Sequence, residues 1–295
     1  MSALALTRAH EGVAPGRSSS RPGGTGSTLI VLIGAAYCLV PLLWVVVAST
    51  KNPAQLFSTS TFAPASGLLD NLRDLSAFHD GIFWRWTLNS ALYSVVGGVL
   101  VTLISSAAGF ALAKYSFRGR SIVLRSLVGG VLLPQIVLAI PLYLLWSRIG
   151  LTNSYASVLI PLLISPYSIF LCMVYAGGSV PGELLEAARL DGASELRIFW
   201  SVAMRIMSPA LITVFLLQFI AIWNNYILPT IMLSDESRFP VTRGLTTMLA
   251  TPTQTAPLYS ITILGSLLSV IPVIVLFLAL QRFWRVDLVS GGLKA

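Results

Sequence analysis

Charged residues are scarce in this sequence. Asp, Glu, Lys and Arg make up only 10% of its 295 residues, and 55% are hydrophobic, whereas soluble domains carry roughly 25% charged residues. A chain of this size with so few polar side chains cannot cover a water-soluble globule. The shortage excludes a cytosolic enzyme, a disordered scaffold and a secreted disulfide domain. It favours a protein that crosses a membrane several times.

Cysteine and histidine are almost missing as well. The two cysteines, Cys38 and Cys172, both lie in apolar runs, so the sequence offers neither a disulfide framework nor zinc-ligand spacing. The two histidines, His10 and His79, are far apart and lie outside the apolar runs. We therefore expect no metal site.

Long apolar runs are what the sequence has in abundance. A helix needs about 20 apolar residues to cross the hydrocarbon core, and the runs lack the alternating polarity of barrel strands. The sequence therefore predicts an all-α, polytopic membrane protein with six transmembrane helices. The predicted spans cover residues 29–49, 88–113, 123–147, 155–177, 208–233 and 260–281.

Residues 1–28 have a different composition, rich in Ser, Gly and Pro with three arginines, which predicts a disordered basic tail. The apolar run that follows is longer than the roughly 7–15 residues of a signal-peptide core, and no small-x-small cleavage site follows it. We expect two parts: the tail over 1–28 and a transmembrane domain over 29–295.

Lys and Arg are distributed unevenly between the predicted loops. Thirteen of the 19 lie in the tail, in the loops after the second and fourth spans and in the C-terminal segment, and six lie in the other loops. The positive-inside rule places the richer side in the cytoplasm, so both termini are expected to be cytoplasmic. The net charge of +8 is therefore largely a topology signal. Contact with anionic lipid is favoured over nucleic-acid binding, and no nucleic-acid-binding motif is present.

Ionisable residues are nearly absent from the predicted spans. Arg125 is the exception, and it lies close enough to a span end to reach the interface. Ion-coupled carriers usually keep such residues in the membrane, although backbone carbonyls could still bind sodium. No lysine follows a glycine as a phosphate-binding loop requires, so a separate subunit is expected to supply the energy for any transport.

The loop between the fourth and fifth spans, residues 181–207, begins PGELLEAARLDGAS. Pro181 suits a first helical turn, Glu183 and Glu186 suit a helix N-terminus, and Gly192 can adopt the positive φ of a helix end. An amphipathic stretch follows over 195–207. The pattern predicts a short helix, a tight turn and a second helix at the membrane face.

Charges of both signs lie along this loop. It carries four acids and three arginines between Glu183 and Arg205, whereas a loop resting on lipid headgroups would favour Lys and Arg. The small side chains of Ala187, Ala188 and Ala193 would let a partner's backbone approach closely. A protein-docking surface is the favoured interpretation, and an interfacial loop on headgroups is the alternative.

Several short motifs lie along the chain, in the loop, at the start of the second span, in the fifth span and in the C-terminal segment. Their residues are Glu186-Ala187-Ala188, Asp191-Gly192-Ala193, Phe199, Val202 and Pro209 in and after the loop; Trp223-Asn224-Asn225-Tyr226 and Pro229; Phe83, Trp86 and Asn89-Ser90; and Pro272, Phe277, Gln281-Arg282 and Gly291-Gly292-Leu293-Lys294-Ala295. The loop resembles the EAA loop of ATP-binding-cassette importer permeases, and the other motifs are similar to the carbohydrate-importer type of that superfamily, which includes the maltose permease subunits. The resemblance covers roughly residues 30–295.

This resemblance implies a type I importer permease in a bacterial or archaeal inner membrane, with a cytoplasmic coupling helix between the fourth and fifth spans. It implies three kinds of partner besides the bilayer: a second permease, usually a related but different chain; two ATP-binding subunits; and an extracytoplasmic substrate-binding protein. The chain itself would hold no cofactor, and ATP and Mg would bind to the partner ATPase subunits. The implied coupling residues are Glu186, Ala187, Ala188, Asp191, Gly192 and Ala193.

The loop departs from the family at Met204-Arg205, where a Leu-Pro pair is usual. The absence of that proline should remove a bend and restore a backbone donor. Arg205 would be free to bind a lipid phosphate.

Polar residues interrupt the fifth predicted span at Asn224 and Asn225. Buried amides need hydrogen-bonding partners, and these two could bind cargo hydroxyls while Trp223 or Tyr226 offers a ring face. The alternative is hydrogen bonding between helices of two subunits, a common role of Asn in membranes. A second expectation concerns Trp84, Trp86 and Trp284, which lie near span ends and should anchor the interface.

Other functions stay open on the sequence alone. The same machinery could import an amino sugar or a glycerol-phosphate ester, although phosphate cargo would favour a cationic path that these spans lack. An integral-membrane enzyme would need a catalytic cluster, and Asp70, Asp74, His79 and Asp80 form the only candidate group; a solvated loop explains them better. A structural membrane protein without transport activity would have no nucleotide-dependent partner.

Overall fold

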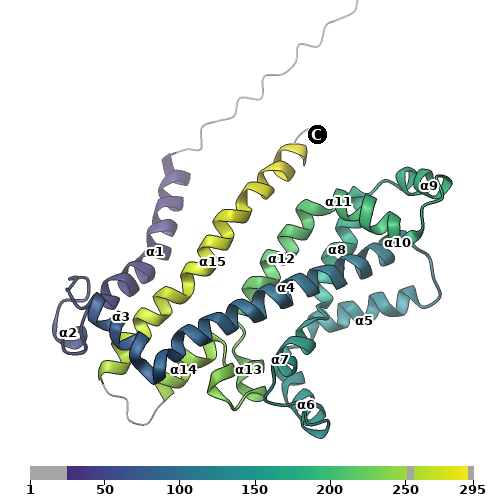
Figure 1. Ribbon diagram of the computed structural model, residues 1–295. Coiled ribbons are helices and arrows are strands. Elements are labelled where there is room, and N and C mark those ends of the chain that lie inside the picture. The colour runs from purple at the N-terminus through teal and green to yellow at the C-terminus, as the bar shows by residue number, and fades with distance from the viewer. Residues whose placement is uncertain (1–24, 251–255, 292–295) are drawn as a thin grey trace, which may run out of the picture. The chain divides into compact units, whose positions relative to one another are not determined.

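The computed structural model describes residues 25–250 and 256–291, and their regular elements are helices (Figure 1). Most of the predicted tail, residues 1–24, lies outside the described residues. The elements are α1 (Thr25–Ser49), α2 (Pro53–Ser58), α3 (Leu68–Ala77), the 3₁₀ turn η1 (Phe78–Gly81), α4 (Ile82–Lys114), α5 (Arg120–Leu132), α6 (Gln135–Arg148), α7 (Tyr155–Leu162), α8 (Pro166–Ser179), α9 (Gly182–Leu190), α10 (Glu195–Ile198), the π turn η2 (Phe199–Ala203), α11 (Met204–Ile206), α12 (Ser208–Trp223), α13 (Ile227–Met232), the 3₁₀ turn η3 (Glu236–Arg238), α14 (Val241–Ala250) and α15 (Ala256–Gly291).

The chain divides into two units, residues 1–44 and 45–295. The described part of the first unit is the beginning of α1, which is apolar throughout. All other described helices belong to the second unit, which holds both hydrophobic cores and the sites described below.

Four stretches are long and apolar enough to cross a membrane without a sharp break, and two further pairs of helices qualify if each bent pair counts as one span. Together they confirm six spans and an all-α membrane fold. The four stretches are Gly26–Ser49, Leu68–Lys114, Tyr155–Ser179 and Leu258–Phe283; the bent pairs are Arg120–Leu132 with Gln135–Arg148, and Glu195–Ile206 with Ser208–Trp223.

The third predicted span, 123–147, consists of two helices with a sharp bend between them. Helices α5 and α6 meet at an angle of 104°. Pro134 stands at the break, with Leu133 before it in the extended region. Because proline disfavours helical backbone in the preceding residue and has no N–H of its own, the helix ends there.

The fifth predicted span, 208–233, is also interrupted. Helix α12 ends at Trp223, Asn224 caps it, and a new short helix, α13, begins at Ile227. Asn224 and Asn225 therefore lie at a helix break and not within a continuous span. At the other end of α12, the helix before it continues through Met204 and Arg205, and the bend of 81° falls at Met207.

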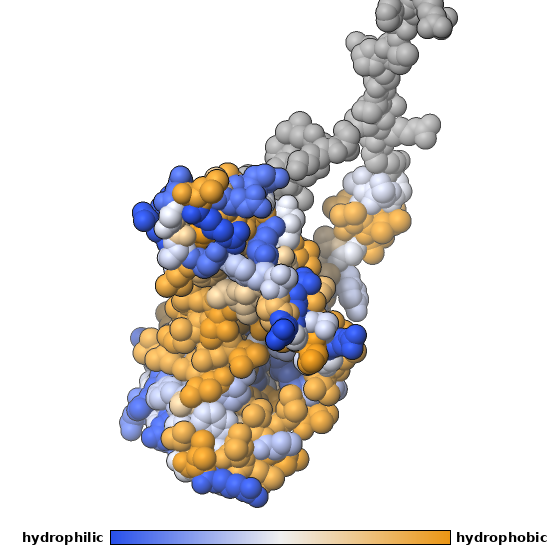
Figure 2. All heavy atoms as spheres, turned by 90° about the vertical axis from the view of Figure 1, so that its right-hand side faces the viewer, coloured by the Kyte–Doolittle hydropathy of each residue, from blue (hydrophilic) through white to orange (hydrophobic). Residues whose placement is uncertain are grey.

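Helix α4 is the central element of the second unit. Its 33 residues extend about 50 Å at 1.5 Å per residue, and α8 and α12 pack along it (Figure 1). Close approach to α8 depends on Gly109, where a Cβ would lie only 2.6 Å from Cys172 Cβ. Figure 2 shows apolar surface across the middle of one face and polar side chains gathered towards its ends, as a bilayer-spanning unit requires.

Two hydrophobic cores form near the two ends of α4. One, which we name the α14-end core, includes Phe83, Trp86 and Tyr93 from the beginning of α4 and residues of α12 to α15. The other, the α9-end core, includes Phe110 from the end of α4. Its remaining members are Cys172, Ala176, Val180, Leu185, Ile198, Phe199, Ala203, Met207, Leu211 and Val214.

Candidate functional site

Helix α9 is held to the α9-end core by Leu185, the only buried residue in this nine-residue helix. Ile198 and Phe199 from the following helix are buried in the same core. An isolated helix of this length would be marginal in water, so tertiary packing through Leu185 has to keep it folded. The rest of its surface is left for other contacts.

The turn after α9 has the geometry that the sequence predicted. Gly192 has a φ of +79°. Its N–H donates to the Arg189 carbonyl, and the Ala193 N–H donates to the Ala188 carbonyl, both at 3.0 Å. This is a Schellman motif, in which a residue of positive φ closes the helix and satisfies its last carbonyls. No heavy atom lies within 4 Å of a Cβ placed on Gly192, so the space around this glycine is open.

The six residues assigned to coupling divide between two faces. Glu186, Ala187, Asp191 and Gly192 are exposed. Ala188 and Ala193 are half-buried and pack against the α9-end core. Their small size serves the closure of this chain's own turn, while the side chains of the other four residues face solvent.

Apolar side chains accompany the charges on this surface. Leu184, Leu190, Leu196 and Trp200 are all exposed, Leu190 by 89%. Exposed apolar residues rimmed by charge are typical of protein–protein contact sites. The α9–α11 segment therefore has the composition of a docking surface.

Hydrogen bonds and an ion pair that the sequence did not predict form a brace between the end of α4 and this segment. The Tyr115 hydroxyl donates to the Glu195 carboxylate, and Arg189 Nε donates to Glu195 Oε1 at 2.8 Å. Burial, together with the hydrogen bond to Glu195, raises the pKa of Tyr115 above its ordinary value. No motif marks this tyrosine, because its partners are 74 and 80 residues further along the chain.

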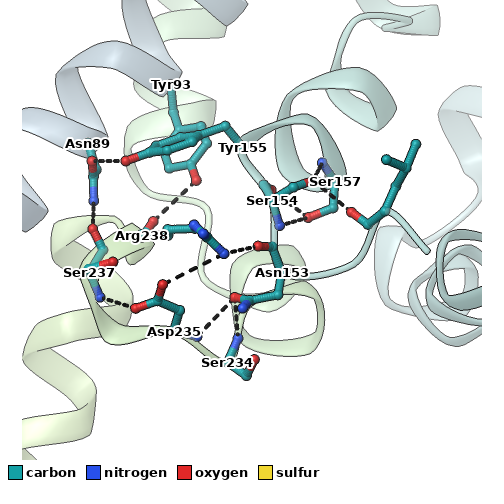
Figure 3. A network of polar contacts seen from close by, with 11 residues as sticks. Asn89, Tyr93, Asn153, Ser154, Tyr155, Ser157, Ser234, Asp235, Ser237 and Arg238 are labelled. Carbon is teal, nitrogen blue, oxygen red and sulfur yellow. Dashed lines mark hydrogen bonds and ion pairs between the residues drawn. The ribbon is translucent and has the colours of Figure 1, made fainter.

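At the beginning of α4, hydrogen bonds fasten the loop of residues 233–241. Asn89 Nδ2 donates to the carbonyls of Ser237 at 2.9 Å and Phe239 at 3.0 Å, and the Tyr155 hydroxyl donates to Asn89 Oδ1 at 3.0 Å (Figure 3). Tyr93 donates to the Arg238 carbonyl at 3.2 Å. The donors to the loop carbonyls come from α4, and Tyr155 of α7 holds Asn89 in place.

Trp86 belongs to the same arrangement. It is completely buried, and its Nε1 donates to the Glu236 carbonyl at 2.9 Å. The expectation that Trp86 anchors the membrane interface is therefore wrong. Trp84 is 44% exposed and suits an anchor, while the side chain of Trp284 lies outside the described residues.

Asn153, in the connection between α6 and α7, also holds the loop of residues 233–241. Its Oδ1 accepts the N–H groups of Ser234 at 3.1 Å and Asp235 at 2.9 Å, and Arg238 donates to its carbonyl (Figure 3). Hydrogen bonds from Ser237 hold the pKa of Asp235 below its ordinary value. Asn153 has a φ of +54°, a conformation that asparagine tolerates better than most residues.

A partly open cavity of about 200 Å³ lies where α12 ends, between α14 and α15. Of the four residues assigned to a cargo path, Trp223 and Asn224 line it. Asn225 instead accepts the Leu228 N–H at the start of α13, and Tyr226 is exposed away from the lining. Asn224 Nδ2 donates to Ile220 in its own helix, at 2.9 Å.

The acidic group considered for an enzyme is distributed among separate contacts. Asp70 faces Arg73 at 3.8 Å, and His79 Nδ1 faces Glu236 at 3.4 Å. Across residues 25–250 and 256–291, no three His, Cys, Asp or Glu side chains lie in a group that could hold a metal ion.

Apolar helices that give up to six spans, with no strands among the described residues, define a polytopic membrane protein. Residues 98–285, well over half of the chain, match the family described as the inner membrane component of binding-protein-dependent transport systems. The chain belongs to this family.

Relatives agree over nearly the whole length. The chain is 33% identical over 273 residues to the arabinooligosaccharides transport system permease protein AraQ of Halalkalibacterium halodurans, which covers 90% of this chain and 96% of that protein. It is 30% identical to the sn-glycerol-3-phosphate transport system permease protein UgpE of Salmonella typhi, over 90% of this chain and 95% of that protein.

A solved structure has the same fold. It is a chain of a bacterial ABC transporter involved in the import of the acidic polysaccharide alginate; the TM-score is 0.75 at 25% identity, covering 88% of this chain and 95% of that chain. These likenesses confirm the identification as an importer permease of the carbohydrate type with a type I fold. The chain is a multi-pass inner membrane protein.

Proposed function

We propose that this chain forms, with a second permease of related but different sequence, the path of an importer for a carbohydrate or a similar solute. Two ATP-binding subunits and an extracytoplasmic substrate-binding protein complete the assembly. ATP and Mg bind to the ATPase subunits, and this chain contributes no cofactor. The exposed face of α9 is the observation that carries the proposal. Only one residue of this helix is buried, so most of its surface is available to an ATP-binding subunit.

The α9 end of the unit faces the cytoplasm in this proposal. The loops with the larger share of Lys and Arg lie on that side, as the positive-inside rule requires. The loop of residues 233–241 then faces the substrate-binding protein. Both termini are cytoplasmic.

Coupling works through the packing of α9. When the ATPase subunits close, they move the exposed residues Glu186, Ala187, Asp191 and Gly192. Leu185 passes the movement to the α9-end core, which contains Phe110 of α4 and Leu211 of α12. Since packed interiors transmit displacement with little compression, two central helices of the unit move with α9.

The cargo passes beside Trp223 and Asn224. These two residues line the cavity between α12, α14 and α15, so the helix break in the fifth span borders this cavity. Permeases for arabinooligosaccharides and for sn-glycerol 3-phosphate are both relatives of this chain. These two cargoes differ in charge, so the charge of this chain's own cargo is the next property to determine.

Gly192→Asp in the reconstituted assembly tests the coupling assignment. A side chain at this position has open space within the chain but adds bulk and charge to the proposed contact face. We expect the variant to lose most transport and most of the ATP hydrolysis that the delivery protein stimulates.

Gly119→Asp is the matched control for this test. Gly119 is also exposed, with a positive φ of +90° and no heavy atom within 4 Å of its Cβ position, but it lies between α4 and α5. The control carries the same backbone strain and the same added charge. Normal transport and normal stimulated hydrolysis in Gly192→Asp would sink the coupling assignment.

A further inference from the structure

The charges of the segment between α8 and α12 are divided between its two halves. In the first half, residues 182–195, Glu183, Glu186 and Asp191 are all exposed, and they take part in no ion pair among the described residues. Arg189 and Glu195 neutralise each other, because Arg189 Nε lies 2.8 Å from Glu195 Oε1. The half that contains α9 therefore presents a net negative surface.

The second half, residues 196–207, carries positive charge only, and we name it the basic half. Arg197 and Arg205 are both exposed, and within residues 25–250 and 256–291 neither belongs to an ion pair. The sequence has no acid between Glu195 and Asp235. Both cations are arginines, whose planar guanidinium can donate two parallel hydrogen bonds to one phosphate group. The basic half thus offers two phosphate-binding groups without an acidic partner of its own.

The bend before α12 places the basic half along the membrane surface. Residues Glu195–Ile206 meet the membrane-spanning helix Ser208–Trp223 at 81°. Since transmembrane helices are tilted by only about 20° on average, a helix at this angle to one of them runs close to the plane of the membrane. Arg205 lies three residues before Ser208, where the apolar helix begins, so it is at the level of the lipid headgroups.

The basic half also has the apolar side chains of an interfacial helix. Trp200 is 51% exposed and Leu196, four residues before it, is 69% exposed. Ile198 and Phe199 are buried in the α9-end core and hold the helix to the unit. Tryptophan is enriched at membrane–water interfaces, and helices that combine arginine with Trp and Leu lie among the headgroups. The exposed side of this helix can therefore contact both the phosphates and the boundary of the acyl chains.

We propose that the basic half binds the headgroups of anionic phospholipids in the leaflet beside it, with Arg197 and Arg205 as the phosphate-binding residues. The inference rests on the proposed function, which places this end of the unit in the cytoplasm. Charge complementarity selects lipid over protein here. A partner surface that complements the acidic α9 half is cationic, and it would repel the two arginines. The two halves therefore bind two different partners.

Quenching of a fluorescent probe by spin-labelled lipid tests this contact in the complete assembly. Ser201→Cys carries the probe, because Ser201 is exposed midway between the two arginines. Cys38→Ser removes the exposed native thiol, whereas Cys172 is completely buried and stays. The vesicles are phosphatidylcholine with either phosphatidylglycerol or phosphatidylcholine spin-labelled near the headgroup.

We expect strong quenching at residue 201 and a preference of at least about fivefold for phosphatidylglycerol, the contribution of one basic residue near an anionic surface. A probe at Leu190→Cys is the comparison, because Leu190 is 89% exposed on α9 and should not be quenched. Absence of quenching at residue 201, or equal quenching by the two lipids, would overturn the proposal.

The double variant Arg197→Gln and Arg205→Gln tests the two arginines with the same probe. The preference for phosphatidylglycerol should fall to about one. Arg118→Gln with Arg125→Gln is the matched control, since both of these arginines are exposed in and after the α4–α5 connection and their loss removes the same charge. The control should keep the preference. An equal loss in both double variants would show a general surface potential and no site.

Copurification tests the alternative partner, the ATP-binding subunit. In detergent without added phospholipid, we expect the Arg197→Gln and Arg205→Gln variant to retain the ATPase subunits as the control does. Selective release of these subunits would assign the basic half to protein docking and overturn the proposal. Because neither measurement uses Gly192→Asp or transport, a failure here is distinguishable from a failure of the coupling assignment.

Discussion

The two ends of α4 hold their loops in opposite ways. At the α14 end, the loop of residues 233–241 is tied down by hydrogen bonds from side chains such as Trp86 and Asn89, which are buried. At the α9 end, apolar packing through Leu185 holds the segment, and its one ion pair, Arg189 with Glu195, is exposed.

This difference has mechanical consequences. Hydrogen bonds to specific carbonyls fix direction and register, and breaking them in a buried place leaves unsatisfied groups. Apolar contacts are non-directional, so a helix held by one leucine can change its angle while it stays attached. These contacts predict a rigid loop at one end of α4 and a helix that can pivot at the other.

The rigid end predicts the largest mutational effect, at Gly244. A Cβ at this position would lie 2.2 Å from Cδ2 and Cε3 of the Trp86 ring, and that ring is completely buried and hydrogen-bonded to Glu236. Since the ring cannot move aside, Gly244→Ala should destabilise the protein by about 3 kcal/mol or more. The measurement is the thermal unfolding of the purified assembly.

Gly129→Ala is the control for that substitution. Gly129 lies within α5, and no heavy atom lies within 4 Å of its Cβ position, so the change should be neutral or slightly stabilising. Equal melting temperatures for the two variants would show that the loop end is less rigid than its contacts indicate.

The pivoting end predicts the next largest effect, at Leu185. Leu185→Ala removes the only buried side chain of α9, and substitutions of this kind in a core cost about 2–5 kcal/mol. Because the other attachments of α9, the half-buried Ala188 and the exposed Arg189–Glu195 pair, are weaker, most of the cost should appear locally, as faster hydrogen exchange over 182–193. Transport should fall with it, while the loop of residues 233–241 keeps its protection.

Leu184→Ala is the comparison within the same helix. Leu184 is 48% exposed, so its truncation should leave the exchange of α9 unchanged and act only on partner docking. If both leucine variants exchange alike, Leu185 is not the pivot.

The sequence predicted one of these two ends much better than the other. The helix, turn and helix of the α9 segment follow from local signals: Pro181 before the helix, Gly192 after it and apolar residues at helical spacing. The fastening of the 233–241 loop depends on pairs such as Asn89 and Phe239, which are 150 residues apart. Local chemistry does not encode such pairings.

The breaks in two spans, by contrast, do have local signals. Hydropathy over 123–147 and 208–233 is continuous and gives the extent of each span but not the position of its break. Pro134 and the Asn224-Asn225 pair carried the signal for the breaks. The cavity beside Trp223 escaped notice because it requires α14 and α15 to be adjacent.

Asn89 tests whether the loop is held by hydrogen bonds or by its apolar contacts. Asn89→Ala leaves the carbonyls of Ser237 and Phe239 and the Tyr155 hydroxyl without their partner, which should cost about 2 kcal/mol. Hydrogen exchange over 234–241 should accelerate accordingly. Thr87→Val on the same helix is the control, because the Thr87 hydroxyl bonds only within α4, to Phe83; similar exchange in both variants would contradict the hydrogen-bonded fastening.

The smallest effect comes from one identical change made at each end of α4. Tyr93→Phe removes a hydroxyl that donates to the Arg238 carbonyl from a completely buried residue, and it should cost about 1–1.5 kcal/mol. Tyr115→Phe removes the hydroxyl that donates to the exposed Glu195 carboxylate, where solvent competes, and it should cost about 0.5 kcal/mol or less. Unfolding of the two variants beside the parent protein measures both values.

The Tyr115 contact also has a definite pH range. Because the pKa of Tyr115 is raised above its ordinary value of 10.0, its protonated form is favoured in the folded protein. Its contribution is then complete below the unfolded pKa, near 10, and is lost as the pH rises through the higher folded value. The stability difference between the parent protein and Tyr115→Phe should therefore be constant from pH 7 to about pH 9 and shrink only above pH 10. A larger loss for Tyr115→Phe than for Tyr93→Phe would reverse the assignment of rigid and pivoting ends, since the exposed brace would then hold more firmly than the buried loop contact.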